Sequence, residues 1–167
     1  MKFNLLRTLV LFSAINTMFS CSSDSSVGQA ASVSSPIVAN YSYSTSENQT
    51  LDLINKYRIS IGLNPLEKIN YISIKSEEHD NYMIANNVVN HNDFVARSED
   101  IIKVLGAKTV GENIAYNYST PQAAFDAWLA SPGHKANIEG NFTNFGIAIR
   151  TNPTNGTKYY TNIFVKI

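Results

Sequence analysis

Apolar residues recur at helical spacing in the stretch that starts at Ser46. Positions three and four apart lie on one face of a helix, so this stretch is predicted to form an amphipathic helix of moderate length. Gly62 and Pro65 follow the last repeat and are predicted to end the helix. The apolar positions of this first pattern are Leu51, Ile54, Tyr57 and Ile61.

A second helical pattern begins near Ile72 and is expected to end near the Asn86-Asn87 pair. One stripe of this helix carries Ile72, Ser76, His79 and Met83. Because His79 shares the stripe with Met83, it is interpreted as a partly buried structural histidine. A polar stretch with the sequence NHNDF follows, and then a short apolar segment at residues 101–105.

The stretch from 109 to 118, TVGENIAYNY, has β-branched and aromatic residues around a Gly-Glu-Asn centre. This composition favours a short strand or an extended loop. The next helix is predicted to start at Pro121, with Thr120 as its cap and Phe125 and Trp128 as apolar anchors. SPGHKANI is predicted to start another helix directly behind it.

Two strand-like runs, residues 144–151 and 158–167, follow the helical patterns. They are joined by NPTNGT, and the Asn155-Gly156 pair within it is a strong hairpin signal. Helices followed by a hairpin indicate an α+β domain with an antiparallel sheet.

The N-terminal residues have the pattern of an export signal. Lys2 and Arg7 precede the short apolar run LVLFSAI, and the single cysteine of the chain, Cys21, ends the MFSC segment that follows it. Residues 1–20 are therefore interpreted as a lipoprotein signal peptide and Cys21 as the site of lipidation. An ordinary signal peptide with a free cysteine is the alternative. Residues 21–45 are rich in Ser and poor in large apolar residues, so they are expected to form a flexible tether.

Composition limits the classes of partner. Lys plus Arg and Asp plus Glu each number 13, and no run of basic residues occurs. A balanced chain of this kind is a poor candidate for binding nucleic acid or an anionic lipid surface. The remaining residues, 46–167, suit one domain with one core, expected to be a monomer.

Glu112 is the candidate for site chemistry, because a carboxylate among apolar neighbours is costly to bury without a partner. Imidazole is a frequent partner of carboxylates in metal binding and proton transfer. The chain has three histidines, His79, His91 and His134, and no two of them have the spacing of a helical zinc motif. The fold must therefore assemble any site.

Four segments, NHNDF, GENIAY, AFDAWLASPGHKANI and NFGIAI, occur in this order. Together they resemble the bacterial branch of the CAP superfamily, the SCP-like domain, which includes cysteine-rich secretory proteins. The resemblance covers the chain from about Ile54 to the terminal FVKI. It implies a three-layer α-β-α sandwich with a central antiparallel sheet.

The resemblance also implies a cleft. His91 and Glu112 match the first histidine and the first acid of the family, and His134 matches the histidine typical of bacterial members. Where many eukaryotic members have a second acid, this chain has Ser131. The resemblance thus implies that Glu112 faces His91 and His134, as a possible site for zinc or another divalent cation or as a hydrogen-bond cluster.

The neighbours of this cluster have simpler interpretations. Ser131 is expected to be a helix N-cap that spends its oxygen on a backbone amide, with His134 as the third helical residue. The positive end of that helix would keep His134 neutral. Asn113 is expected to orient Glu112 or to satisfy loop backbone.

Three functions remain open from the sequence. The resemblance favours a binding module on the cell envelope, lipid-anchored at Cys21, for a lipid, a small apolar ligand or a protein partner. The second is a metal-dependent hydrolase in which Glu112 is the candidate base or a ligand beside His91 and His134. The third is a purely structural role for the cluster.

Overall fold

The computed structural model describes residues 39–167. The predicted signal peptide, Cys21 and most of the predicted tether lie outside the described residues. Within the described range, none of the helices combines the length and the apolar content that crossing a bilayer would require.

A four-stranded sheet forms the centre, with its strands in the order β1-β3-β4-β2. β3 (Asn144–Thr151) and β4 (Lys158–Lys166) form the predicted hairpin, and Gly156 in its turn has a φ of 74°. β2 (Thr109–Tyr116) pairs antiparallel with β4. The two-residue β1 (Glu67–Lys68) adds a short parallel pairing to β3, so the otherwise antiparallel sheet is mixed at this edge.

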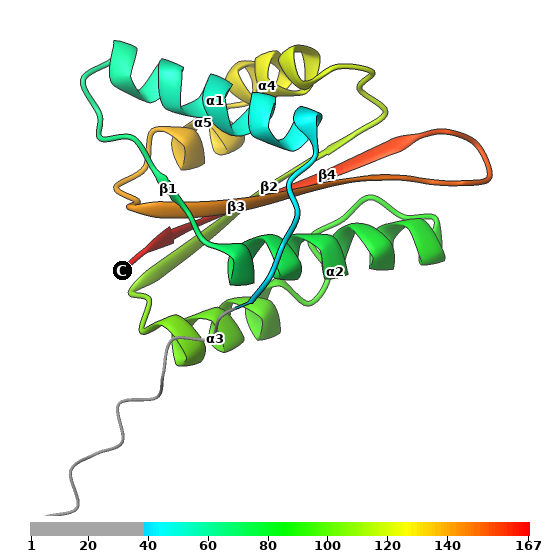
Figure 1. Ribbon diagram of the computed structural model, residues 1–167, viewed down its shortest axis with the longest axis horizontal. Helices are drawn as coiled ribbons and strands as arrows, with labels where there is room; N and C mark the ends of the chain where they lie inside the picture. The colour runs from blue at the N-terminus through cyan, green and yellow to red at the C-terminus, as the bar shows by residue number, and fades with distance from the viewer. Residues whose placement is uncertain (1–38) are drawn as a thin grey trace, which may run out of the picture. The chain divides into compact units, whose positions relative to one another are not determined.

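Helices cover both faces of the sheet (Figure 1). α1 (Thr45–Ser60), α4 (Pro121–Ala130) and α5 (Pro132–Ile138) lie on one face. α2 (Asn70–Asn86) and α3 (Phe94–Leu105) lie on the other. The predicted three-layer α-β-α sandwich is therefore confirmed.

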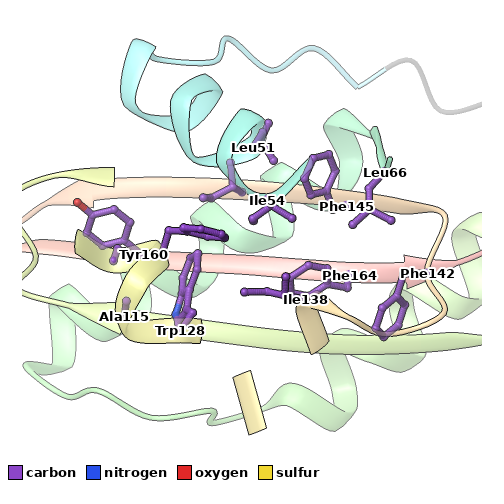
Figure 2. Packing of buried hydrophobic residues seen from close by; sticks show 13 residues of the cluster. Leu51, Ile54, Leu66, Ala115, Trp128, Ile138, Phe142, Phe145, Tyr160 and Phe164 are labelled. Atoms are coloured by element: carbon purple, nitrogen blue, oxygen red, sulfur yellow. The ribbon is translucent and has the colours of Figure 1, made fainter. Parts of the chain in front are cut away.

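The alternation of side chains along the strands divides the core in two. Tyr160 and Phe164 of β4 point toward α1 and α4, where they pack with Ile54 and Trp128 (Figure 2). Ile163 of β4 points the other way and joins a smaller cluster under α2 and α3. The members of that smaller cluster are Ile72, Ile101, Ala107, Ile163 and Val165.

The helix signals read from the sequence are largely confirmed. Thr120 accepts a hydrogen bond from the Ala123 amide at 3.2 Å and begins α4. α2 ends at Asn86, and the following Asn87 has a left-handed φ of 52°. The sequence predicts only an apolar segment at 101–105, whereas α3 is a 12-residue helix that starts at Phe94. Within this helix only Ile101 is fully buried.

Close backbone packing positions α2 on the sheet. A Cβ added at Gly146 of β3 would collide with the backbone of Ile72 and Ser73 in α2. The Ser73 hydroxyl oxygen also accepts a hydrogen bond from the Ile147 amide at 3.0 Å. The glycine of the NFGIAI segment therefore fixes how close α2, and with it His79, comes to the strands.

Residues just before α1 already belong to the packed domain. Tyr41 donates a hydrogen bond to buried Glu47 at 2.7 Å, and the Tyr43 hydroxyl lies 2.9 Å from the Ser73 hydroxyl. Ser44 caps α1 and forms a capping box with Glu47. The ordered domain thus begins before Ser46, where composition places the end of the tether.

Buried Arg58 ties α1 to the segment that leads into β3. Its guanidinium donates to the carbonyl oxygens of Ile138 at 2.6 Å and Gly140 at 2.9 Å. Its Nε donates to the Asn64 carbonyl at 2.8 Å. Carbonyl acceptors thus replace the water that this cation loses on burial.

Asp80 of α2 generates a prediction about stability and pH. Its side chain is buried, one oxygen accepts from the Thr161 hydroxyl at 2.6 Å, and its Oδ2 lacks a hydrogen-bond partner among the described residues. Burial raises the pKa of this carboxyl well above its ordinary value. An unfolded aspartate has a pKa of about 3.9, so above that pH folding takes up a proton and stability falls as pH rises.

The substitution Asp80→Asn removes this cost, so we expect it to raise the melting temperature at pH 7 by several degrees. The difference from wild type should shrink toward a pH of about 4, where aspartate is protonated in both states. Thermal melts at the two pH values measure this, with exposed Asp52→Asn as the matched control. A loss of stability of equal size at both pH values would contradict the interpretation.

Candidate functional site

Glu112 lies in the middle of the edge strand β2, and its side chain is only 1% exposed. Its Oε1 is 2.8 Å from the Nδ1 of His91. Its Oε2 accepts two hydrogen bonds from Arg97, at 2.9 Å from Nε and 2.7 Å from Nη2. Both carboxylate oxygens are therefore occupied by protein donors.

Arg97 is the member of this cluster that the sequence reasoning missed. It comes from α3, and its side chain is only 9% exposed. Its Nη1 also donates to the Asn92 carbonyl at 3.2 Å, which ties the loop before α3 to the same guanidinium. The available signal was the buried carboxylate itself, because such a group requires a compensating cation.

His79 supports the loop that carries His91. Its Nε2 donates to the Asn90 carbonyl at 2.8 Å and lies 4.0 Å from Oε1 of Glu112. Burial lowers the pKa of His79, and the nearby charge of Arg97 lowers it further. A neutral, buried histidine that holds a loop agrees with the structural role expected for it.

His91 contacts Glu112 through Nδ1, and its Nε2 takes no part in that contact. A carboxylate accepts hydrogen bonds, so Nδ1 of His91 carries the proton in this contact. In the neutral ring, Nε2 then offers a lone pair. The side chain is 47% exposed, so this acceptor is accessible from outside.

His134 lies in α5 and lines a cleft with His91 along the edge of β2. The cleft encloses about 470 Å³. Burial lowers the pKa of His134, and the proximity of His91 lowers it further. Both effects favour the neutral state expected for His134. The cleft is lined by Val89, His91, Ile114, Ala115, Tyr116, Tyr118, Ala127, Ser131 and His134.

The expected contact between Glu112 and His134 is not formed, because successive side chains of a strand point to opposite faces. Glu112 points toward α2 and α3, and Asn113 points toward α5. Asn113 donates to the His134 carbonyl at 2.9 Å and accepts from Asn137 at 2.8 Å. It therefore satisfies backbone in α5, which matches the second of the two roles expected for Asn113, and it does not orient Glu112.

Ser131 occupies the N-cap position of α5, with Pro132 next to it and His134 third in the helix. The prediction that its hydroxyl caps the helix is wrong, because its side chain forms no cap hydrogen bond with the described residues of α5. The Ser131 carbonyl accepts from the Lys135 amide at 2.8 Å instead.

A three-ligand zinc site formed by His91, Glu112 and His134 does not fit this geometry. Across residues 39–167, no three His, Cys, Asp or Glu side chains are grouped so that they could hold a metal ion. The guanidinium of Arg97 also occupies the carboxylate that a cation would need. Catalytic zinc sites use three protein ligands, so the required set is incomplete.

Side chains from α4 and α5 secure the outer edge of β2. Trp128 donates from its indole to the Ile114 carbonyl at 2.8 Å. Asn137 donates to the Glu112 carbonyl at 3.1 Å. Two outward carbonyl groups of the edge strand are thus satisfied without a further strand.

Sequence comparison agrees with the fold. Residues 51–165 match the model of the family described as CAP, the cysteine-rich secretory protein family. The chain is 35% identical over 129 residues to the uncharacterized membrane protein YlbC of Bacillus subtilis, a match that covers 73% of this chain and 35% of that protein. It is 34% identical over 110 residues to the uncharacterized protein YkwD of the same species, covering 64% of this chain and 43% of that protein. The chain thus spans less than half the length of these relatives.

Solved structures share the architecture. An extracellular protein containing an SCP domain from Bacillus anthracis superposes with a TM-score of 0.63 at 28% identity, covering 73% of this chain and 40% of that one. An outer surface protein from Borrelia burgdorferi gives a TM-score of 0.65 at 19% identity, covering 75% of this chain and 97% of that one. At its low identity, the second likeness concerns the fold alone.

The contact between Glu112 and Arg97 generates a stability prediction. In Glu112→Ala the buried guanidinium loses its counter-charge, which costs on the order of 3–5 kcal/mol of unfolding free energy. Adding Arg97→Met should recover part of the loss, because an apolar side chain needs no partner there. Urea denaturation of both single variants and the double variant measures this. Strictly additive losses would show that the two side chains are not coupled.

Proposed function

The chain belongs to the CAP family, the cysteine-rich secretory proteins, and we propose that it is an exported binding module that holds a ligand in the cleft between His91 and His134. In this proposal Glu112 organises the cleft and takes no part in a reaction. The main support for this role of Glu112 is the geometry of its carboxylate, both oxygens of which accept hydrogen bonds from protein groups.

A hydrolytic role would require Glu112 to accept a proton or to bind a metal ion. Each oxygen of the carboxylate already accepts from a protein group, one from His91 and the other from Arg97. A general base must lie within reach of the substrate, and the Glu112 side chain is only 1% exposed. The geometry therefore favours binding over metal-dependent hydrolysis.

The cleft has the character of a ligand site. It combines apolar side chains such as Val89 and Tyr116 with the polar groups of His91, Ser131 and His134. Its volume of about 470 Å³ lies within the range of pockets that bind small molecules. This combination supports a small apolar ligand or a partner segment and distinguishes the proposal from a purely structural role.

We further propose that the module is attached to the bacterial cell envelope through a lipid on Cys21. The support is the sequence before Cys21, together with the names of the relatives, one a membrane protein and one an extracellular protein. The net charge of zero supports a partner other than nucleic acid. A monomer is proposed, because the cleft is formed by one chain.

The cleft proposal is tested with small neutral aromatic fragments screened by saturation-transfer NMR. Ser131→Trp places a large ring in the cleft, whereas Ser60→Trp makes the same change at an exposed position of α1 outside it. We expect fragments to bind the wild type and Ser60→Trp and to lose binding, about tenfold or more in affinity, in Ser131→Trp. Equal binding by all three proteins would refute a ligand site in this cleft.

The anchor is tested in bacteria that express the full chain. Metabolic labelling with a fatty-acid analogue should mark the wild type and leave Cys21→Ser unlabelled, because the chain has no other cysteine. The variant should also appear in the soluble fraction after cell disruption. Membrane retention of an unlabelled Cys21→Ser protein would contradict lipid anchoring.

A further inference from the structure

The outer edge of β2 forms one wall of the cleft, at Ile114, Ala115 and Tyr116. β2 is the last strand at its side of the sheet, since among the described residues its only strand neighbour is β4. An edge strand offers backbone amide and carbonyl groups that an extended peptide can use. Which of these groups are free depends on the register with β4.

The register fixes the direction of each backbone group. The Asn117 amide donates to the Lys158 carbonyl at 2.9 Å, in line with the register that pairs Tyr116 with Tyr159. In an antiparallel pair, residues that exchange hydrogen bonds alternate with residues that do not. Ala115 therefore bonds to β4, while the backbone groups of Ile114 and Tyr116 point outward.

Three outward groups in the cleft remain unused. The Ile114 carbonyl already accepts a hydrogen bond from the Trp128 indole. The amides of Ile114 and Tyr116 and the Tyr116 carbonyl take part in no hydrogen bond formed by the described residues. Asn117 has a left-handed φ of 63°, so the strand ends there and the usable edge is short.

The cleft matches a peptide better than it matches an ion or a lipid tail. The described residues that line it include no Lys, Arg, Asp or Glu, which suits an uncharged backbone. In the neutral form of His91, Nε2 is an acceptor for a peptide N–H, since Nδ1 donates to Glu112. A lipid tail would leave the edge amides without acceptors, at a cost in free energy.

We propose that the cleft binds a short extended peptide that adds to the edge of β2. The peptide accepts from the amides of Ile114 and Tyr116 and donates to the Tyr116 carbonyl. Its side chains lie against Val89 and Tyr116, whose exposed fractions are 47% and 38%. This inference rests on the proposed binding function of the same cleft and names the class of ligand.

The test selects ligands from a display library of short linear peptides with the full-length protein as bait. Enriched peptides are synthesised in two forms, one unmodified and one with alternate backbone amides N-methylated. The unmodified form should bind the wild type and Ser60→Trp, and binding should fall about tenfold or more with Ser131→Trp or with N-methylation. Amide hydrogen exchange should slow at Ile114 and Tyr116 and stay unchanged at Ala115.

The other outcomes separate this inference from the proposed function. In one outcome, N-methylated and unmodified peptides bind equally well and the Ile114 and Tyr116 amides stay unprotected from exchange. This outcome would overturn strand addition but would still support a cleft that binds ligands. A library that yields no peptide dependent on the cleft, while aromatic fragments still bind there, would overturn the peptide inference alone. Failure of both peptides and fragments would overturn both.

Discussion

The ion pair between Glu112 and Arg97 is the interaction on which the arrangement of the site depends. A carboxylate on an edge strand is buried only because α3 brings a guanidinium to it. The same guanidinium holds the Asn92 carbonyl, and the same carboxylate holds His91. The position of the loop before α3 and the ring orientation of His91 thus follow from one charge pair. Its cost of desolvation is offset by its several hydrogen bonds.

Strand β2 separates the site into two halves. Glu112 belongs to the layer of α2 and α3, and Asn113 belongs to the layer of α5. The two histidines meet only at the rim of the sheet, where His91 arrives from one layer and His134 from the other. The described residues that line this cleft include no Lys, Arg, Asp or Glu, and the ion pair of Glu112 and Arg97 lies on the other side of the strand. This arrangement suits recognition of an uncharged ligand.

Much of the fold is predictable from the sequence because its signals are local. The Asn155-Gly156 turn, the Thr120 cap and the apolar stripe of α2 each act within a few residues, and each is confirmed. The site is only partly predictable. Glu112 and His91 are identified through a family resemblance, but Arg97 is missed because its contact with Glu112 depends on how α3 packs against β2. The relation of Glu112 to His134 is misjudged because it depends on which face of β2 each residue meets, and that is set by the pairing with β4.

The position of β4 has a consequence for how the domain forms. β2 and β3 do not pair with each other; each pairs with β4, which follows both of them in the chain. The four-stranded sheet cannot form until residues 158–166 have been synthesised, so before then a nascent chain lacks the strand that joins β2 to β3. Such a chain stays incompletely folded during synthesis. Pairing between strands that are distant in the sequence also slows folding. That delay suits the export proposed for this chain, because a polypeptide that folds late can cross a membrane before it folds.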